Sequence, residues 1–351
     1  MDVDVHVDVD NSPVEPIRLE RVPLSVLDLA PVRDGATPAQ ALAESVELAR
    51  HVEALGYRRY WFAEHHGMPG IASAAPAVLI ARIAAATSTI RVGSGGVMLP
   101  NHAPLAVAEQ FGTLEALFPG RIDLGIGRAP GTDSLTAAAL RRGMPASGDD
   151  LPELLEELCG FFRGDFPDGH PFRRIRAVPA LGHEPPIWLL GSSGYSAQLA
   201  GHLGLPFAFA HHFSQANTLP ALALYRERFR PSLALARAQA MIGAIVVVAD
   251  TDAEARRLAL PTALAFLRLR QGTPGTYPTV EQAEAHPWTP RERAFADDWL
   301  SLNVVGGPAS VRAQLDRLLE ATRVDELMVL CAVPDPEARR RSYTLLRELH
   351  G

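Results

Sequence analysis

The chain of 351 residues contains no lysine, so all 33 residues counted as lysine or arginine are arginines. Lysine supplies the amine of Schiff-base and pyridoxal phosphate enzymes, and it binds phosphate in P-loop proteins and kinases. These classes of protein are therefore excluded. A phosphate group, if the protein binds one, must be held by arginine, by hydroxyl groups and by backbone N–H groups.

Cysteines and long apolar runs are also scarce. The two cysteines, Cys159 and Cys331, lie in unrelated apolar contexts without the spacing of a disulfide framework or a zinc site. No apolar run is long enough to span a bilayer, and the first residues have neither the basic nor the apolar region of a signal peptide. We therefore expect a cytoplasmic protein without a membrane partner.

Most of the net charge of −7 comes from one end of the chain. Residues 1–16 hold five acidic residues and no arginine, which leaves 35 acidic residues against 33 arginines elsewhere. No stretch concentrates cations, so nucleic-acid binding is not expected. The acidic start predicts a disordered tail over residues 1–20, followed by a single domain over residues 21–351.

Strand-like and helical patterns alternate along that domain. The predicted strands lie within residues 23–32, 57–66, 90–99, 121–127, 185–193, 205–213, 242–250 and 325–333. Such alternation implies a parallel sheet, and eight units in this length favour a closed barrel over an open doubly wound sheet. We predict an α/β fold, a single (β/α)8 TIM barrel. Residues 141–184 and 272–298 interrupt the alternation and are expected to be insertions that wall a pocket.

Chemically distinctive residues gather where these strands end. They are Asp28, His65, His66, Gly95, Gly96, Gly127, Arg128, Ser192, Ser193, His211 and His212. One isolated histidine at such a place is more often a hydrogen-bonded loop residue. Clustering over six strand ends favours a functional site instead, because active sites of parallel barrels lie at the carboxyl ends of the strands.

Two other kinds of site are weighed against this pattern. Adjacent residues on a strand point to opposite faces, so His65 and His66 cannot both bind one metal ion, and no metal is expected. Neither glycine-rich piece is a nucleotide-binding motif, since "GSGGVMLP" lacks the following lysine and "GIGRAPG" has Pro130 where a third glycine is required. These glycines would still let a flat ring approach the backbone closely.

The stretch "LLGSSGYSAQLA" predicts a strand, then Ser192, Ser193 and Gly194, then a helix that begins near Tyr195 or Ser196. Free N–H groups at a helix start, with hydroxyl groups beside them, can hold an anion. In a chain without lysine, Arg128 at the neighbouring strand end is a natural partner for a phosphate. A serine-rich helix cap without a ligand is the alternative at this point.

Several motifs together resemble the bacterial luciferase-like flavin monooxygenases, in particular luciferase family oxidoreductases of group 1. They are "YWFAEHH", "RVGSGGVMLPNHAPLAVAEQF", "FPGRIDLGIGRAPGTD", "IWLLGSSGYSAQLAGHLGLPFAFAHHF" and "VVGGPASV". The similarity runs in order from about Pro23 to the C-terminus. It implies a TIM barrel, usually a homodimer, that binds reduced FMN as a diffusible co-substrate from a separate flavin reductase.

The resemblance also implies roles for individual residues. His65 matches a histidine beside the flavin that matters for catalysis, and Gly95 and Gly96 match a pair joined by a cis peptide under the isoalloxazine. The family's phosphate ligands fall in the segment predicted above to hold an anion: Arg128, Ser192, Ser193 and Ser196, with Gly194 and Tyr195 between them. Luciferase has a cysteine in place of Gly127 and a glutamate in place of Ser192, which argues against light emission and long-chain aldehyde substrates.

The implied reaction is that of dioxygen with reduced FMN to a peroxyflavin, which oxygenates a small organic substrate by hydroxylation, epoxidation or Baeyer-Villiger insertion. By position, we expect the substrate to contact the two insertions and Asn101, His102, His211 and His212. A deazaflavin-dependent hydride transferase and a non-catalytic flavin-binding protein are the alternatives.

Overall fold

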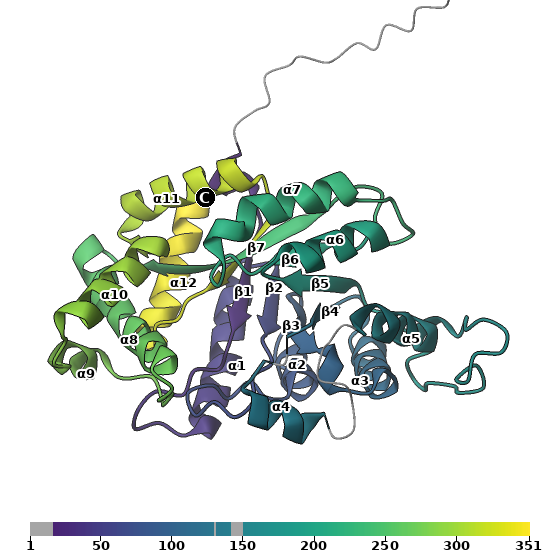
Figure 1. Ribbon diagram of the computed structural model, residues 1–351. Helices are drawn as coiled ribbons and strands as arrows, with labels where there is room; N and C mark the ends of the chain where they lie inside the picture. The colour runs from purple at the N-terminus through teal and green to yellow at the C-terminus, as the bar shows by residue number, and fades with distance from the viewer. Residues whose placement is uncertain (1–16, 130, 142–149) are drawn as a thin grey trace, which may run out of the picture.

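The centre of the computed structural model is a closed parallel barrel of eight strands (Figure 1). The structure describes residues 17–129, 131–141 and 150–351. The barrel strands are β1 (Leu24–Asp28), β2 (Arg59–Phe62), β3 (Arg91–Met98), β4 (Ile122–Gly127), β5 (Ile187–Gly191), β6 (Phe207–Phe209), β7 (Ala240–Val248) and β9 (Glu326–Leu330). Neighbours pair in chain order from β1 to β7, and β9 closes the barrel between β7 and β1. The predicted TIM barrel is thus confirmed.

A ninth strand, β8 (Val304–Gly306), was not predicted. β7 spans nine residues, pairs with β9 along its first half and continues far enough to pair with β8 through Val246–Val248. The apolar run of β8 is only Val304 and Val305, which is too short to indicate a strand, whereas the equally short β6 stands within the longer apolar run of residues 205–210.

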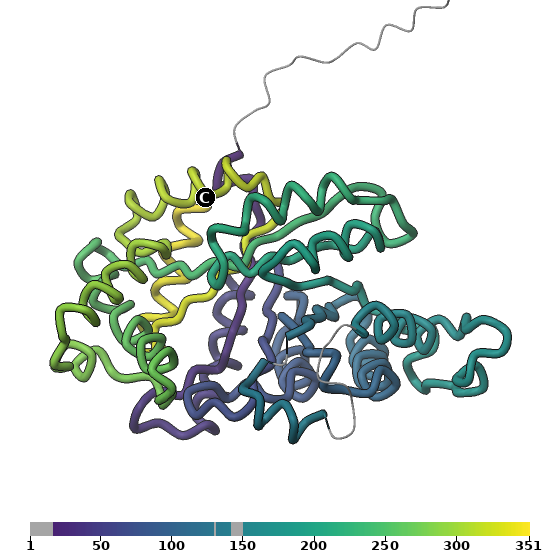
Figure 2. The backbone as a smooth tube through the Cα atoms, viewed as in Figure 1, coloured from purple at the N-terminus to yellow at the C-terminus, as the bar shows by residue number. Residues whose placement is uncertain are grey.

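Helices surround the barrel, as Figures 1 and 2 show. Those that follow barrel strands or β8 are α1 (Pro38–Ala54), α2 (Pro76–Ala84), α3 (Pro104–Leu117), α6 (Gly194–Leu203), α7 (Thr218–Arg228), α8 (Asp252–Arg270), α11 (Pro308–Thr322) and α12 (Pro336–His350). Helix α1 begins with a capping box formed by Thr37 and Gln40. None of the helices in the described part of the chain is both long and apolar enough to cross a membrane.

Shorter elements lie within the insertions and connections. These are α4 (Ser134–Leu140), α5 (Leu151–Arg163), α9 (Val280–Ala285), α10 (Pro290–Leu302) and the 3-10 turns η1 (Leu19–Arg21), η2 (Leu99–Asn101) and η3 (Gln215–Asn217). The first insertion packs α5 on α3, and the second packs α9 and α10 on α8 (Figure 2). Both insertions therefore extend the helical layer of the barrel.

The boundary of the N-terminal tail differs from the prediction. Residues 1–16 lie outside the described residues, but residues 17–20, also assigned to the tail, are packed against the barrel. The backbone N–H groups of Ile17 and Leu19 donate to Glu320 and Asp316 of α11, and Leu19 is fully buried. The assignment of residues 17–20 to a disordered tail is therefore wrong, because Leu19 completes the core.

A layer of buried charges fills the barrel near the amino ends of the strands. Arg59 Nε lies 2.8 Å from Glu326 Oε1, and Arg59 Nη1 lies 2.8 Å from Asp123 Oδ2. The indole N–H of Trp61 also donates to Asp123 Oδ2, across 3.1 Å. Each buried charge has a partner of opposite sign, which compensates the cost of its burial. The hydrogen bond to Asp123 also fixes the position of the Trp61 ring.

Candidate active site

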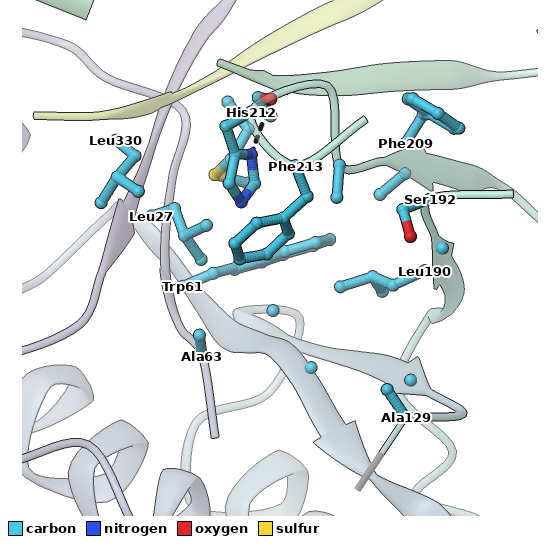
Figure 3. Close-up of a pocket in the computed structure, with 18 of the residues that line it drawn as sticks. Leu27, Trp61, Ala63, Ala129, Leu190, Ser192, Phe209, His212, Phe213 and Leu330 are labelled. Atoms are coloured by element: carbon cyan, nitrogen blue, oxygen red, sulfur yellow. Dashed lines mark hydrogen bonds between the residues drawn. The ribbon is translucent and has the colours of Figure 1, made fainter. Parts of the chain in front are cut away.

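A cavity of about 220 Å³ opens at the carboxyl ends of the barrel strands (Figure 3). Its lining is mostly apolar, with Leu27 and Trp61 among its members. The polar side chains that reach it are His65, Arg128, Ser192, Ser193, Ser196 and His212. These side chains follow four different strands, β2, β4, β5 and β6, and they meet at one place, as the clustering at strand ends predicts.

One end of the cavity carries hydrogen-bond donors suited to an anion. Helix α6 begins at Gly194 after Ser193, and the side chain of Ser193 does not cap its first N–H groups. The guanidinium of Arg128 lies 4.4 Å from the centroid of the Tyr195 ring, and within the described residues no carboxylate pairs with it. Gly194 and Tyr195 do not line the cavity themselves. A phosphate placed here would meet serine hydroxyl groups, helix N–H groups and a guanidinium.

Gly95 and Gly96 form part of the cavity wall and are joined by a cis peptide bond, as the resemblance implies. Neither position could take a side chain without a shift of its neighbours. A Cβ atom on Gly95 would lie 2.8 Å from Leu27 Cδ1, and one on Gly96 would lie 2.7 Å from the carbonyl oxygen of Gly125. The wall is therefore bare backbone, which a flat ring can approach closely.

His65 and His66 point in different directions. His65 lines the cavity, and burial lowers its pKa from the ordinary value of 6.5. Its Nδ1 is buried without a hydrogen-bond partner among the described residues, which leaves Nε2 as the accessible ring nitrogen. His66 instead places Nε2 2.7 Å from Glu64 Oε1. The two rings therefore cannot share an ion, and no cluster of three potential metal ligands occurs in the part of the chain that is described.

Of the four residues expected to contact substrate, His212 reaches the cavity and the other three do not line it. His102 hydrogen-bonds Glu64 through Nε2 across 2.8 Å. Asn101 is buried and accepts a hydrogen bond from Arg141. His211 places Nδ1 2.8 Å from Thr218 Oγ1. A contact of these three residues with substrate stays a prediction.

The two insertions differ in their relation to the site. A smaller cavity of about 80 Å³ adjoins the main one and shares His65 and Phe213 with it. The second insertion lines this smaller cavity through Pro274, Gly275 and Tyr277. The described part of the first insertion lines neither cavity.

Two acidic residues near the site have structural partners. Asp28 was singled out from the sequence, but its Oδ2 accepts hydrogen bonds from Ser45 and Tyr60 at 2.5 Å each, and it does not line the cavity. Glu64 was given no role from the sequence, although it is fully buried beside His65. Glu64 ends the apolar run of the motif "YWFAEHH", so its burial could have been expected from the sequence. A buried carboxylate needs several hydrogen-bond donors, which would have marked it as a structural residue.

A parallel barrel with an apolar cavity, hydrogen-bond donors at one end of it and a wall of glycine backbone is an architecture suited to a flat phosphorylated cofactor. Residues 22–326 match the family model described as luciferase-like monooxygenase. The chain belongs to this family, which confirms the resemblance found in the sequence.

Individual relatives agree with this assignment. A luciferase-like monooxygenase of Escherichia coli (strain K12) is 47% identical over 93% of this chain and 97% of its own length. The N-acetyl-S-alkylcysteine monooxygenase of Bacillus subtilis (strain 168) is 35% identical over 93% of this chain and 97% of its own length. The crystal structure of apo-MsnO8 superposes with a TM-score of 0.85 at 43% identity, covering 93% of this chain and 98% of that one.

Proposed function

We propose that this protein is the oxygenase of a two-component system, which takes reduced FMN from a separate flavin reductase and oxygenates a small organic substrate with dioxygen. The anion-binding end at the start of α6, joined to an apolar cavity with a glycine wall, carries the proposal. When bound and reduced, FMN supplies the activation of dioxygen. A homodimer in the cytosol is part of the same proposal.

Each polar group of the cavity then has a task. The phosphate is held by Arg128, Ser192, Ser193 and Ser196 together with the first N–H groups of α6. The apolar lining would exclude water from the ring of the cofactor, and the bare backbone of Gly95 and Gly96 would let that ring approach closely. His65 is neutral near pH 7 because burial lowers its pKa, so its accessible Nε2 can exchange a proton with the reacting molecules.

The charge of the lining suggests the class of substrate. Arg128 is the one arginine among the described residues that line either cavity, and no carboxylate lines them. With Arg128 committed to the phosphate, a charged substrate would find no partner. We therefore propose a small uncharged substrate. The substrate named for the Bacillus subtilis relative, an N-acetyl-S-alkylcysteine, contains a thioether and also a carboxylate. We therefore take a thioether without the carboxylate as the first trial, alongside hydroxylation, epoxidation and Baeyer-Villiger insertion of other uncharged substrates.

The test compares FMN with riboflavin, which lacks the phosphate. We expect the parent protein to bind FMN at least about tenfold more tightly than riboflavin, because charge-assisted hydrogen bonds hold the phosphate. Arg128→Gln should remove most of this preference. The matched control is Arg237→Gln, since the Arg237 side chain is 86% exposed and lies outside the cavities. Binding is followed by flavin fluorescence.

Three results would contradict the proposal. Equal affinities for FMN and riboflavin would show that the protein does not bind the phosphate group. Tighter binding of a deazaflavin cofactor than of FMN would favour the hydride transferase. Binding of reduced FMN without oxygen uptake that responds to any substrate would favour a non-catalytic flavin-binding protein.

A further inference from the structure

His212 occupies a position in the main cavity that the tasks above do not explain. It follows β6, and its Nδ1 lies 2.8 Å from the carbonyl oxygen of Gly243 in β7. The backbone N–H of His212 donates to the same oxygen across 2.9 Å. A carbonyl oxygen only accepts hydrogen bonds, so Nδ1 carries the ring hydrogen. In the neutral ring, Nε2 is then a bare acceptor.

Gly243 makes this position of the ring possible. A Cβ atom at residue 243 would lie 3.0 Å from both Cε1 and Nδ1 of His212, which is closer than carbon atoms of neighbouring side chains normally approach. Any larger residue at 243 would require the imidazole to shift. The two hydrogen bonds and the missing side chain therefore hold the ring in one place and in one tautomer.

The ring is neutral at ordinary pH. Burial lowers the pKa of His212 to about 4, and the hydrogen bond to Gly243 opposes this effect only in part. Figure 3 shows the bonded nitrogen of the ring turned to the carbonyl oxygen and the second nitrogen turned the opposite way, toward the side on which Leu27, Phe213 and Trp61 lie. An acceptor thus faces the cavity.

The protein offers this acceptor no donor of its own. Within the described residues, the His212 ring makes its hydrogen bond through Nδ1 and none through Nε2. The cavity also contains the apolar side chains of Met241, Phe266, Met328 and Leu330. An acceptor enclosed by apolar groups is costly to leave unpaired once water is displaced, so a bound molecule that supplies a donor is favoured.

We propose that Nε2 of His212 accepts a hydrogen bond from an O–H or N–H group of the molecule bound in the cavity. The inference rests on the proposed function, in which this molecule is either the organic substrate or FMN, whose ring also carries an N–H group. A site built around such an acceptor rejects a ligand of the same shape that lacks the donor, because Nε2 is then left unpaired.

The direct test is 15N NMR of the full chain labelled at histidine. The Nε2 signal of His212 is assigned by its loss in His212→Phe. The protein is titrated with FMN, and the FMN-loaded protein is then titrated with phenol or with anisole, its methyl ether. A shift of the signal with phenol but not with anisole identifies the substrate as the donor, and a shift with FMN alone identifies the flavin. No shift in any titration overturns the proposal.

Variants provide a second measurement. We expect the parent to bind phenol about tenfold more tightly than anisole if the substrate is the donor, or to bind reduced FMN about tenfold more tightly than His212→Phe does if the flavin is the donor. His212→Gln keeps an acceptor near Nε2 and should retain the effect. His183→Phe is the matched control, because His183 makes the same type of bond, from Nδ1 to the Pro179 carbonyl oxygen across 2.9 Å, on the exposed surface.

The outcomes separate this inference from the proposed function. A folded His212→Phe protein with the parent's FMN affinity and the parent's preference between phenol and anisole overturns the role of His212. Failure of the parent to bind FMN contradicts the proposed function instead, and phenol and anisole are then compared on the protein without flavin.

Discussion

Glu64 and His102 are joined by a hydrogen bond of 2.8 Å between Oε1 and Nε2, although 38 positions separate them in the chain. The same oxygen accepts from His66 Nε2 across 2.7 Å, and Oε2 accepts from the backbone N–H of Met98 across 3.0 Å. One buried carboxylate therefore ties the segment that carries His65 to the end of β3, where the glycine wall lies.

Replacing this carboxylate by an amide should weaken the site. In Glu64→Gln, an NH2 group must face either the N–H of Met98 or the two imidazoles, which leaves donors unpaired. We expect a loss of about 1–3 kcal/mol in the free energy of unfolding, measured by urea denaturation at pH 7. Glu153→Gln, an exposed position in α5, is the control and should change stability by less than about 0.5 kcal/mol. Equal stability of the two variants would contradict the role of Glu64.

Glu64 also predicts a pH dependence of stability. Burial by itself would raise the pKa of Glu64, but hydrogen bonds from His102, His66 and Met98 outweigh it and lower the pKa below 4.5. A lowered pKa in the folded state means that the stabilisation is complete above pH 4.5 and is lost as the pH falls through the folded value. Urea denaturation at pH 7, 5, 4 and 3 should show a steeper loss for the parent than for Glu64→Gln. If the stability of both proteins fell in parallel with pH, Glu64 would not be the source of the pH dependence.

The glycine wall predicts a graded response to alanine. A Cβ atom on Gly96 would meet the backbone oxygen of Gly125 at 2.7 Å, whereas one on Gly127 would meet the flexible Sδ of Met98 at 2.8 Å. Backbone cannot move aside as a methionine can, so Gly96→Ala should weaken FMN binding by about tenfold or more and Gly127→Ala by less than about threefold. Fluorescence titration measures both. A larger loss of FMN affinity in Gly127→Ala than in Gly96→Ala would show that Gly96 is not part of the surface that binds FMN.

The charged layer of the barrel predicts a large stability effect. Asp123 is fully buried and accepts hydrogen bonds from Arg59, Arg91 and Trp61. Asp123→Asn leaves two guanidinium groups without a full partner, and we expect a loss of about 3–5 kcal/mol in the free energy of unfolding. Asp168→Asn is the control: its pair with Arg173 is exposed, and such pairs contribute about 1 kcal/mol or less. Thermal and urea unfolding check both variants.

His65→Ala tests the chemical step. We expect the variant to bind FMN with about the parent's affinity, because the phosphate ligands are unchanged, but to release hydrogen peroxide in place of oxygenated product. The measurement is the ratio of peroxide formed to oxygen consumed, with a substrate identified by oxygen uptake. The same ratio in the variant and the parent would remove His65 from the proposed mechanism.

The sequence by itself determined the barrel and the position of the candidate site at the carboxyl ends of its strands. The eight barrel strands could be predicted because strands buried on both faces give continuous apolar runs, as in "GAIVVV" of β7, which is buried throughout. The segment around Ser192 and Ser193 could be predicted because a strand, two serines and a helix start are adjacent in the chain. Such patterns involve residues that are adjacent in the chain, so they can be recognised without knowledge of the fold.

Tertiary structure alone decided which of these residues face the cavity and what holds them there. Asn101 and His102 looked equivalent to His212 in the sequence, yet they turn to Arg141 and Glu64. The bond between His212 and Gly243 joins residues 31 positions apart, and the charge layer joins β2, β4 and β9. These pairings depend on strand register and on the closure of the barrel, which brings distant residues together and leaves no periodic pattern in the chain.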